Sequence, residues 1–235
     1  MKKLVTFGDS FLAQRRSFEE TESRSWIDYV CRENKFRLDG YGDGGTNPYN
    51  AILNFLDYNK DFHTCFFSWS HIFRVIYNNR RLIDIANGYE TAQEQIDIPQ
   101  QELSKLYYKY VFATDEFEWV KAQAMLEWFD RHLQENYKDK KFIHLYSLHI
   151  SDKAFYPHIF KHGINIKPHL AEFSYIGGED YNHADRLIHL TTEAHQLFAK
   201  QLNKVLKDES LNNGDIVEFS LEIYNIQSVS FYEPH

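Results

Sequence analysis

The sequence contains little cysteine, little proline and no long apolar run. Its two cysteines, Cys31 and Cys65, form no Cys-x-x-Cys pair and are too few for a disulfide framework. The 5 prolines and 10 glycines gather into no flexible linker. The apolar stretch after Met1, Lys2 and Lys3 is too short for a signal peptide, and no later stretch approaches the length of a membrane span. These absences predict a soluble cytoplasmic protein without a membrane partner.

Basic residues are also few. The chain carries 26 Lys and Arg against 34 Asp and Glu, a formal net charge of −8. A nucleic-acid backbone would have to be bound by a local basic patch, and the sequence contains no long one, so we expect no nucleic-acid partner. Hydrophobic residues make up 43% of the 235 residues, which is enough to bury one sizeable core. We therefore expect a single domain over residues 1–235.

Short apolar runs alternate with helical patterns along the chain. Strands are predicted at 4–7, 36–38, 63–69 and 142–148, and helices at 25–34, from about 48, at 115–137 and at 191–206. This alternation predicts an α/β fold, a three-layer α/β/α sandwich around a mainly parallel sheet. The long helix at 115–137 is predicted to bury its large apolar residues, which are Phe117, Met125, Trp128, Phe129 and Leu133.

Two segments fit this alternation less well. Residues 72–112 are longer than an ordinary connection and are predicted to form a helical insertion or lid beside the strand ends. Residues 215–235 form a C-terminal extension, in which weak alternation predicts a terminal strand or hairpin.

Gly8, Asp9 and Ser10 follow directly on the first predicted strand. Open α/β sheets carry their ligands at the carboxyl ends of the strands, so a nucleophilic Ser10 hydroxyl would be useful at this place. Taken alone, the tripeptide favours a strand-terminating turn with a helix cap.

Two further segments could serve the same edge of the sheet. The second strand runs into a glycine-rich stretch containing Gly44, Gly45 and Asn47, where backbone N–H groups can approach a ligand and stabilise an oxyanion. His189 lies just before the late helix, and Asp185 is four residues upstream. In these places His189 could act as a general base and Asp185 could orient its ring. Taken alone, the glycines favour a tight turn. His189 taken alone does not indicate a catalytic role, because this part of the chain is rich in histidine.

In this order the three elements resemble the SGNH (GDSL-type) hydrolase family. The resemblance runs from Gly8 to the end of the late helix and implies the mainly parallel, flavodoxin-like sheet of that family. It implies that Ser10 is the nucleophile and that its backbone N–H is an oxyanion donor. The family's second block, a glycine followed closely by Ser or Thr and often Asn, is matched around Gly44, Gly45 and Asn47, which would complete the oxyanion site.

The last block of the family is also matched, with one shift. His189 is followed six residues later by His195 and then by Ala199, which agrees with the spacing of the family and makes His189 the implied base. The triad aspartate is expected at position 186, which is Arg186, so Asp185 is the implied partner, one position away.

The third block departs from the family pattern. Where the family has Gly-x-Asn-Asp, this chain has Ser68-Trp69-Ser70-His71, so Ser70 takes the place of an oxyanion asparagine. A hydroxyl can donate one hydrogen bond there. Divergent members of the family with a Trp-Ser third block are similar to this sequence, and Asp9 and Trp69 complete the implied substrate-binding set.

The resemblance implies a serine esterase or deacylase that uses no cofactor and no metal. Its substrate would be a small-molecule or carbohydrate ester, such as an O-acetylated sugar, hydrolysed through an acyl-enzyme on Ser10. One alternative is a non-catalytic binding module on the same fold. Another is a metal-dependent enzyme in which His158 and His162 share a helix face and bind zinc with His149 or His169. The oligomeric state stays open.

Overall fold

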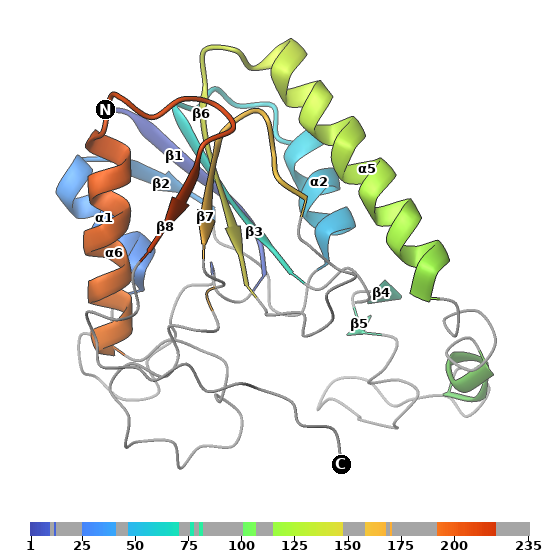
Figure 1. Cartoon of the computed structure of the whole chain (residues 1–235). Coiled ribbons are helices and arrows are strands. Elements are labelled where there is room, and N and C mark those ends of the chain that lie inside the picture. The colour runs from blue at the N-terminus through green and yellow to red at the C-terminus, as the bar shows by residue number, and fades with distance from the viewer. Residues whose placement is uncertain are drawn as a thin grey trace.

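A computed structural model describes residues 1–9, 12, 25–40, 47–70, 76–77, 80–81, 101–106, 115–147, 158–167, 170 and 192–219. Its centre is a six-stranded sheet in the order β2-β1-β3-β6-β7-β8, and every neighbouring pair in that sheet is parallel (Figure 1). The strands are β1 Lys3–Gly8, β2 Arg37–Asp39, β3 Thr64–Trp69, β6 Lys141–Tyr146, β7 Ile164–Lys167 and β8 Ile216–Glu218. Because β2 lies on one side of β1 and β3 on the other, the sheet has a topological switch point between β1 and β3.

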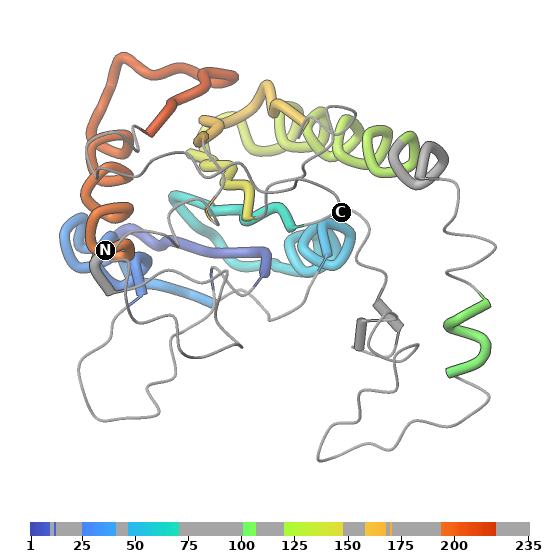
Figure 2. The backbone as a smooth tube through the Cα atoms, turned by 60° about the horizontal axis from the view of Figure 1, so that its bottom comes forward, coloured from blue at the N-terminus to red at the C-terminus, as the bar shows by residue number. Residues whose placement is uncertain are grey.

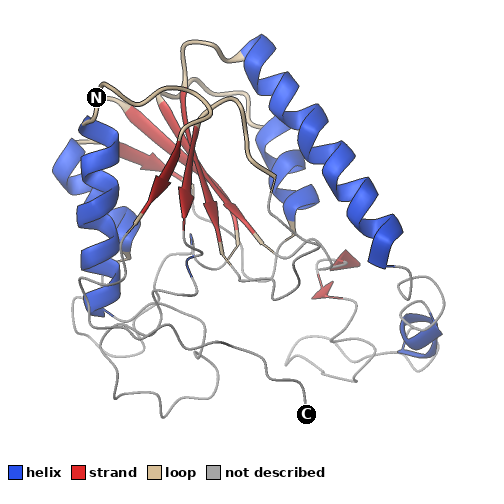
Figure 3. Cartoon of the chain, viewed as in Figure 1, coloured by secondary structure: helices blue, strands red, loops and turns tan. Residues whose placement is uncertain are grey.

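Helices cover both faces of this sheet (Figure 2, Figure 3). Helices α1 Trp26–Asn34 and α6 Thr192–Lys207 pack on one face, and α2 Pro48–Leu56 and α5 Asp115–Asn136 pack on the other. This arrangement confirms the predicted three-layer sandwich with a parallel sheet. Within the described part of the chain, no helix is long and apolar enough to cross a membrane.

The two segments that fitted the alternation poorly are described in part. In the 72–112 segment, β4 Ile76–Tyr77 pairs antiparallel with β5 Arg80–Arg81, and residues 101–106 are helical. The insertion therefore contains strands as well as the predicted helix. The C-terminal extension supplies β8, which confirms the predicted terminal strand.

Strand β7 was not predicted from the sequence. It is four residues long, and its second residue, Asn165, is polar and fully buried. The Asn165 side chain accepts a hydrogen bond from Phe160 N at 2.9 Å and donates one to Phe160 O at 2.8 Å. These bonds satisfy the buried amide, so a polar residue that breaks the apolar pattern is tolerated inside the sheet.

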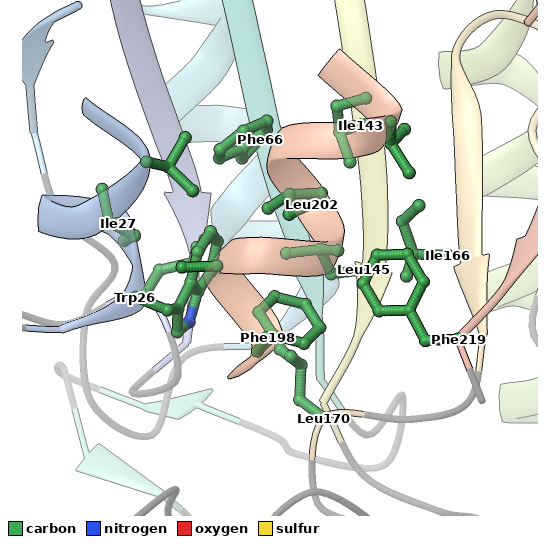
Figure 4. Packing of buried hydrophobic residues seen from close by; sticks show 14 of the residues in the cluster. Trp26, Ile27, Phe66, Ile143, Leu145, Ile166, Leu170, Phe198, Leu202 and Phe219 are labelled. Carbon is green, nitrogen blue, oxygen red and sulfur yellow. The ribbon is translucent and has the colours of Figure 1, made fainter. Parts of the chain in front are cut away.

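The face under α1 and α6 has an apolar core to which Trp26 belongs (Figure 4). The Trp26 ring lies 5.7 Å from the ring of Phe66 in β3 and 5.1 Å from that of Phe198 in α6. Burying a side chain of this size stabilises the fold by about 1.5–3 kcal/mol. Trp26 therefore joins both helices to the sheet.

The opposite face is more aromatic, with Phe55, Phe67, Phe129 and Phe142 in contact. Helix α5 presents Leu126, Phe129 and Leu133 to it, and Met125 is partly buried. The prediction for Trp128 is wrong, because its side chain is 47% exposed. At about 100° per residue, Trp128 lies beside the stripe formed by Leu126, Phe129 and Leu133 and not on it. The side chain of Phe117 lies outside the described residues.

Candidate active site at the carboxyl edge of the sheet

The carboxyl ends of β1 and β3 meet at the switch point of the sheet. Gly8 at the end of β1 lies opposite Ser68 in the parallel register. The next residue, Asp9, is fully buried, and its Oδ1 accepts a hydrogen bond from Ser68 Oγ at 2.9 Å. A buried carboxylate and a buried hydroxyl thus join the two strand ends immediately before Ser10 in the chain.

Gly8 is required by this close approach. Its φ is +149°, a conformation that side chains disfavour, and a Cβ there would lie 2.4 Å from the carbonyl oxygen of Ser68. The glycine of the Gly8-Asp9-Ser10 tripeptide therefore has a packing role that the sequence alone did not reveal.

Trp69 and Ser70 follow Ser68 at the same edge. Trp69 is buried, its indole Nε1–H donates to His144 Nδ1 at 3.1 Å, and its ring stacks on Phe67 and Phe160 with centroids 4.7 and 4.9 Å away. The indole is thus held in place by its neighbours. Ser70 is 6% exposed and directly follows the end of β3.

The end of β6 is tied to the same segment. Ser147 donates to the carbonyl oxygen of Trp69 twice, from its backbone N at 3.0 Å and from its Oγ at 3.1 Å. Trp69, the residue before Ser70, is therefore fixed both by its stacking neighbours and by the residue that follows strand β6.

Asn47 begins helix α2. Its Oδ1 accepts a hydrogen bond from Asn50 N at 2.8 Å, and Pro48 occupies the first helical position. An oxyanion accepts hydrogen bonds, so the amide N–H group is the part of this side chain that could donate to one.

The start of helix α6 is anchored near the start of α1. His195 Nδ1 accepts a hydrogen bond from the backbone N–H of Trp26 at 3.1 Å. This bond satisfies one of the amide groups left open at a helix N-terminus. It also places the beginning of α6, three residues after His189 in the chain, beside the beginning of α1.

Five of the predicted site residues cannot be located in this way. Ser10, Gly44, Gly45, Asp185 and His189 lie outside the described residues. The structure brings together Asp9 with the Ser68–Ser70 segment and places Asn47 at the start of α2.

The histidines proposed for a metal site do not share a helix face. His158 and His162 lie in an irregular segment before β7, and that expectation is wrong. His162 Nε2 bonds to the carbonyl oxygen of Tyr137 at 3.1 Å. Among the described residues, no group of three or more His, Cys, Asp or Glu side chains could hold a metal ion.

Instead, this segment is held by Asp130 of α5, which the sequence reasoning missed. The buried carboxylate accepts from Lys161 N at 2.8 Å and His162 N at 3.0 Å, and lies 3.5 Å from His158 Nε2. Burial by itself raises the pKa of Asp130, but the His158 ring and the two backbone amides outweigh burial and lower that pKa below its ordinary value. The available signal was the position of Asp130 four residues after Leu126, on the stripe of α5 that faces the core.

No protein-family model and no curated protein matches this sequence. Among solved structures, the chain is similar to a lipolytic protein of the G-D-S-L family from Desulfitobacterium hafniense, with 10% identity and a TM-score of 0.35 over 87% of this chain and 99% of that one. It is similar to an acetyl xylan esterase from Geobacillus stearothermophilus, with 12% identity and a TM-score of 0.30 over 88% of this chain and 74% of that one. It is also similar to a G-D-S-L family lipolytic protein from Veillonella parvula, with 14% identity and a TM-score of 0.32 over 96% of this chain and 81% of that one. At these identities and TM-scores the similarity does not assign the chain to that family.

Proposed function

We propose that this chain is a serine hydrolase of the esterase or deacylase class that cleaves a small acyl ester through an acyl-enzyme on Ser10. Carbohydrate O-acetyl groups belong to this substrate class. The proposal is supported above all by the position of the Gly8-Asp9 segment. Gly8 ends β1, Asp9 is buried against β3, and Ser10 is the next residue in the chain. The switch point of a parallel sheet is where this type of architecture binds its ligands.

In the proposed reaction, Ser10 Oγ attacks the acyl carbon while the imidazole of His189 takes its proton. The tetrahedral intermediate collapses, the ester C–O bond breaks, and the leaving alcohol takes the proton from His189. Water, deprotonated by His189, then attacks the acyl carbon, which releases the acid and returns the hydrogen to Ser10. Asp185 holds the imidazole in the orientation that both steps need.

The oxyanion that forms in each step needs hydrogen-bond donors. We assign this role to the backbone N–H groups of Ser10 and of Gly44 or Gly45, with a side-chain donor from Ser70 or from the amide nitrogen of Asn47. Losing one donor of this kind costs about 10²–10³ in kcat when nothing replaces it, so Ser70 is the residue on which full activity would depend.

The test is hydrolysis of p-nitrophenyl acetate together with labelling by a fluorophosphonate probe and peptide mapping. We expect turnover that a chelator does not change and a probe adduct on Ser10. Ser10→Ala should reduce both to background with no loss of folding, because one hydroxyl at a strand end leaves no large cavity. Ser210→Ala removes an exposed hydroxyl elsewhere and should leave both unchanged. Unchanged turnover in Ser10→Ala, or turnover that the chelator abolishes, would contradict the proposal.

A non-catalytic binding module on the same fold is the second candidate. It is favoured by the third block, in which Ser70 replaces an amide donor. Absence of both turnover and labelling, with binding of an acetylated oligosaccharide by the wild-type chain in calorimetry, would support this candidate.

A further inference from the structure

We propose that Ser68 is a positioning residue for this hydrolysis, because it holds the Asp9 side chain, and with it the chain that leads into Ser10, against the end of β3. This inference rests on the function proposed above. It assigns a role to a residue outside the nucleophile, the base and the oxyanion donors.

The geometry leaves little freedom for this pair. Asp9 is 0% exposed and Ser68 is 1% exposed, and they are joined by an Oγ to Oδ1 distance of 2.9 Å. The backbones of Gly8 and Ser68 approach so closely that no side chain fits at position 8. A hydrogen bond to a buried carboxylate is also stronger than one between neutral groups.

The pair acts at a position where small shifts matter. Asp9 precedes Ser10 directly, so a movement of its side chain and backbone displaces the nucleophile. A displacement of about 1 Å at a reacting group can cost about 10²-fold in rate. Removing the Ser68 hydroxyl takes one hydrogen-bond donor from the buried Asp9 carboxylate. We expect the Asp9 side chain to shift in response, because an unsatisfied buried polar group is costly.

Ser147 offers a matched control at the same edge. It is 0% exposed and its hydroxyl also bonds to a neighbouring strand end, the carbonyl of Trp69. Its backbone N–H bonds to the same carbonyl oxygen, so the contact survives when the hydroxyl is removed. Ser147→Ala therefore measures how the loss of a buried serine hydroxyl affects activity when the contact between the two strand ends is kept.

The experiment compares Ser68→Ala and Ser147→Ala with the wild-type chain in p-nitrophenyl acetate hydrolysis and in the rate of fluorophosphonate labelling at Ser10. We expect Ser68→Ala to lower kcat and the labelling rate by about tenfold or more with KM within about twofold, since only the reacting geometry changes. Ser147→Ala should stay within about twofold of wild type in both. In an Asp9→Ala background, Ser68→Ala should cause no further loss, because its acceptor is gone. If Asp9→Ala does not fold, the comparison of the two serine variants decides alone.

The outcomes separate this inference from the function on which it rests. Wild-type labelling at Ser10 with an unchanged rate in Ser68→Ala overturns the positioning role and leaves the hydrolase. Equal losses in Ser68→Ala and Ser147→Ala, each with a lowered melting temperature, also overturn it, since they show general destabilisation. A wild-type chain that neither turns over nor labels overturns the proposed function, and the positioning role with it.

Discussion

The indole Nε1–H of Trp69 donates a hydrogen bond across the sheet to Nδ1 of His144, at 3.1 Å. The other ring nitrogen of His144, Nε2, lies 2.9 Å from the carbonyl oxygen of His162 and can only donate to it. Since Nδ1 accepts and Nε2 donates, the ring is neutral in the fold. Burial lowers the pKa of His144 to about 3, which keeps it neutral at physiological pH.

Replacing this histidine should cost much stability. His144→Phe keeps a flat ring in the stack on Phe160 but leaves the Trp69 indole N–H and the His162 carbonyl without a partner. Each buried group left unsatisfied costs about 1–3 kcal/mol, so we expect a loss of about 2–6 kcal/mol in the free energy of unfolding, measured by urea denaturation. A change below about 0.5 kcal/mol would show that the bonds are not maintained in solution.

The same residue should make stability depend on pH. Its pKa is lowered from 6.5 in the reference state to about 3 in the fold, so the unfolded chain binds the extra proton at intermediate pH. Its contribution to stability is complete above pH 6.5 and falls as the pH drops from 6.5 towards 3. Urea denaturation at several pH values should therefore show the gap between wild type and His144→Phe narrowing through this window. A constant gap would contradict the neutral buried ring.

The buried carboxylate of Asp130 should contribute strongly to stability, because it binds the segment that leads into β7. Asp130→Asn removes the charge that binds two backbone amides and lies 3.5 Å from His158 Nε2, and we expect a loss of about 3–5 kcal/mol in the free energy of unfolding. Because the pKa of Asp130 is lowered in the fold, the contribution is present above the carboxyl's ordinary pKa and is lost as the pH falls through the lowered value.

Asp61 is the matched control for that substitution. It also carries a lowered pKa, through a hydrogen bond from Lys140, but its side chain is 88% exposed. Asp61→Asn should leave the free energy of unfolding close to that of the wild type, because exposed ion pairs contribute little. Equal effects of the two substitutions in thermal unfolding would refute the role of burial.

Gly8→Ala should prevent normal packing of the strand ends. Its methyl group would lie within 3 Å of the backbone of Ser68, and we expect a loss of more than about 3 kcal/mol or no folded protein. Gly40→Ala is the control, since Gly40 has a φ of +93° but, among the described residues, the nearest atom that an added Cβ would meet is the Thr6 carbonyl oxygen at 3.8 Å. It should show only the backbone penalty of about 1–2 kcal/mol. Circular dichroism melts of both variants provide the measurement.

Ser70→Ala tests the altered third block and depends on the proposed hydrolase. If the hydroxyl stabilises the oxyanion, kcat should fall more than KM rises, because the bond strengthens only as the carbonyl oxygen gains charge. We expect about a tenfold or larger fall in kcat with p-nitrophenyl acetate. A rise in KM at constant kcat would instead make Ser70 the polar end of a buried strand.

Local patterns were enough to predict most of the architecture. The apolar run at 64–69 and the helical spacing at 26–34 read as a strand and a helix because their periodicity is set by neighbouring residues in the chain. The same reasoning placed Gly8, Asp9 and Ser10 at a strand end. Strand β7 was not predicted, because its buried Asn165 breaks the apolar pattern. The hydrogen bonds of Asn165 to the backbone of Phe160 make this possible, and no periodicity reveals them.

The alternation of strands and helices, and the chemistry available at the ends of the strands, therefore follow from local sequence patterns. Which of those strand ends meet depends on how the elements pack together. Asp9 and Ser68 are 59 residues apart, and Asp130 is 32 residues from His162, yet each pair is joined by a buried hydrogen bond. The physical reason is that local spacing governs backbone geometry, whereas the partner of a buried polar group is set by how distant elements pack, since each such group must find a hydrogen bond wherever the fold places it.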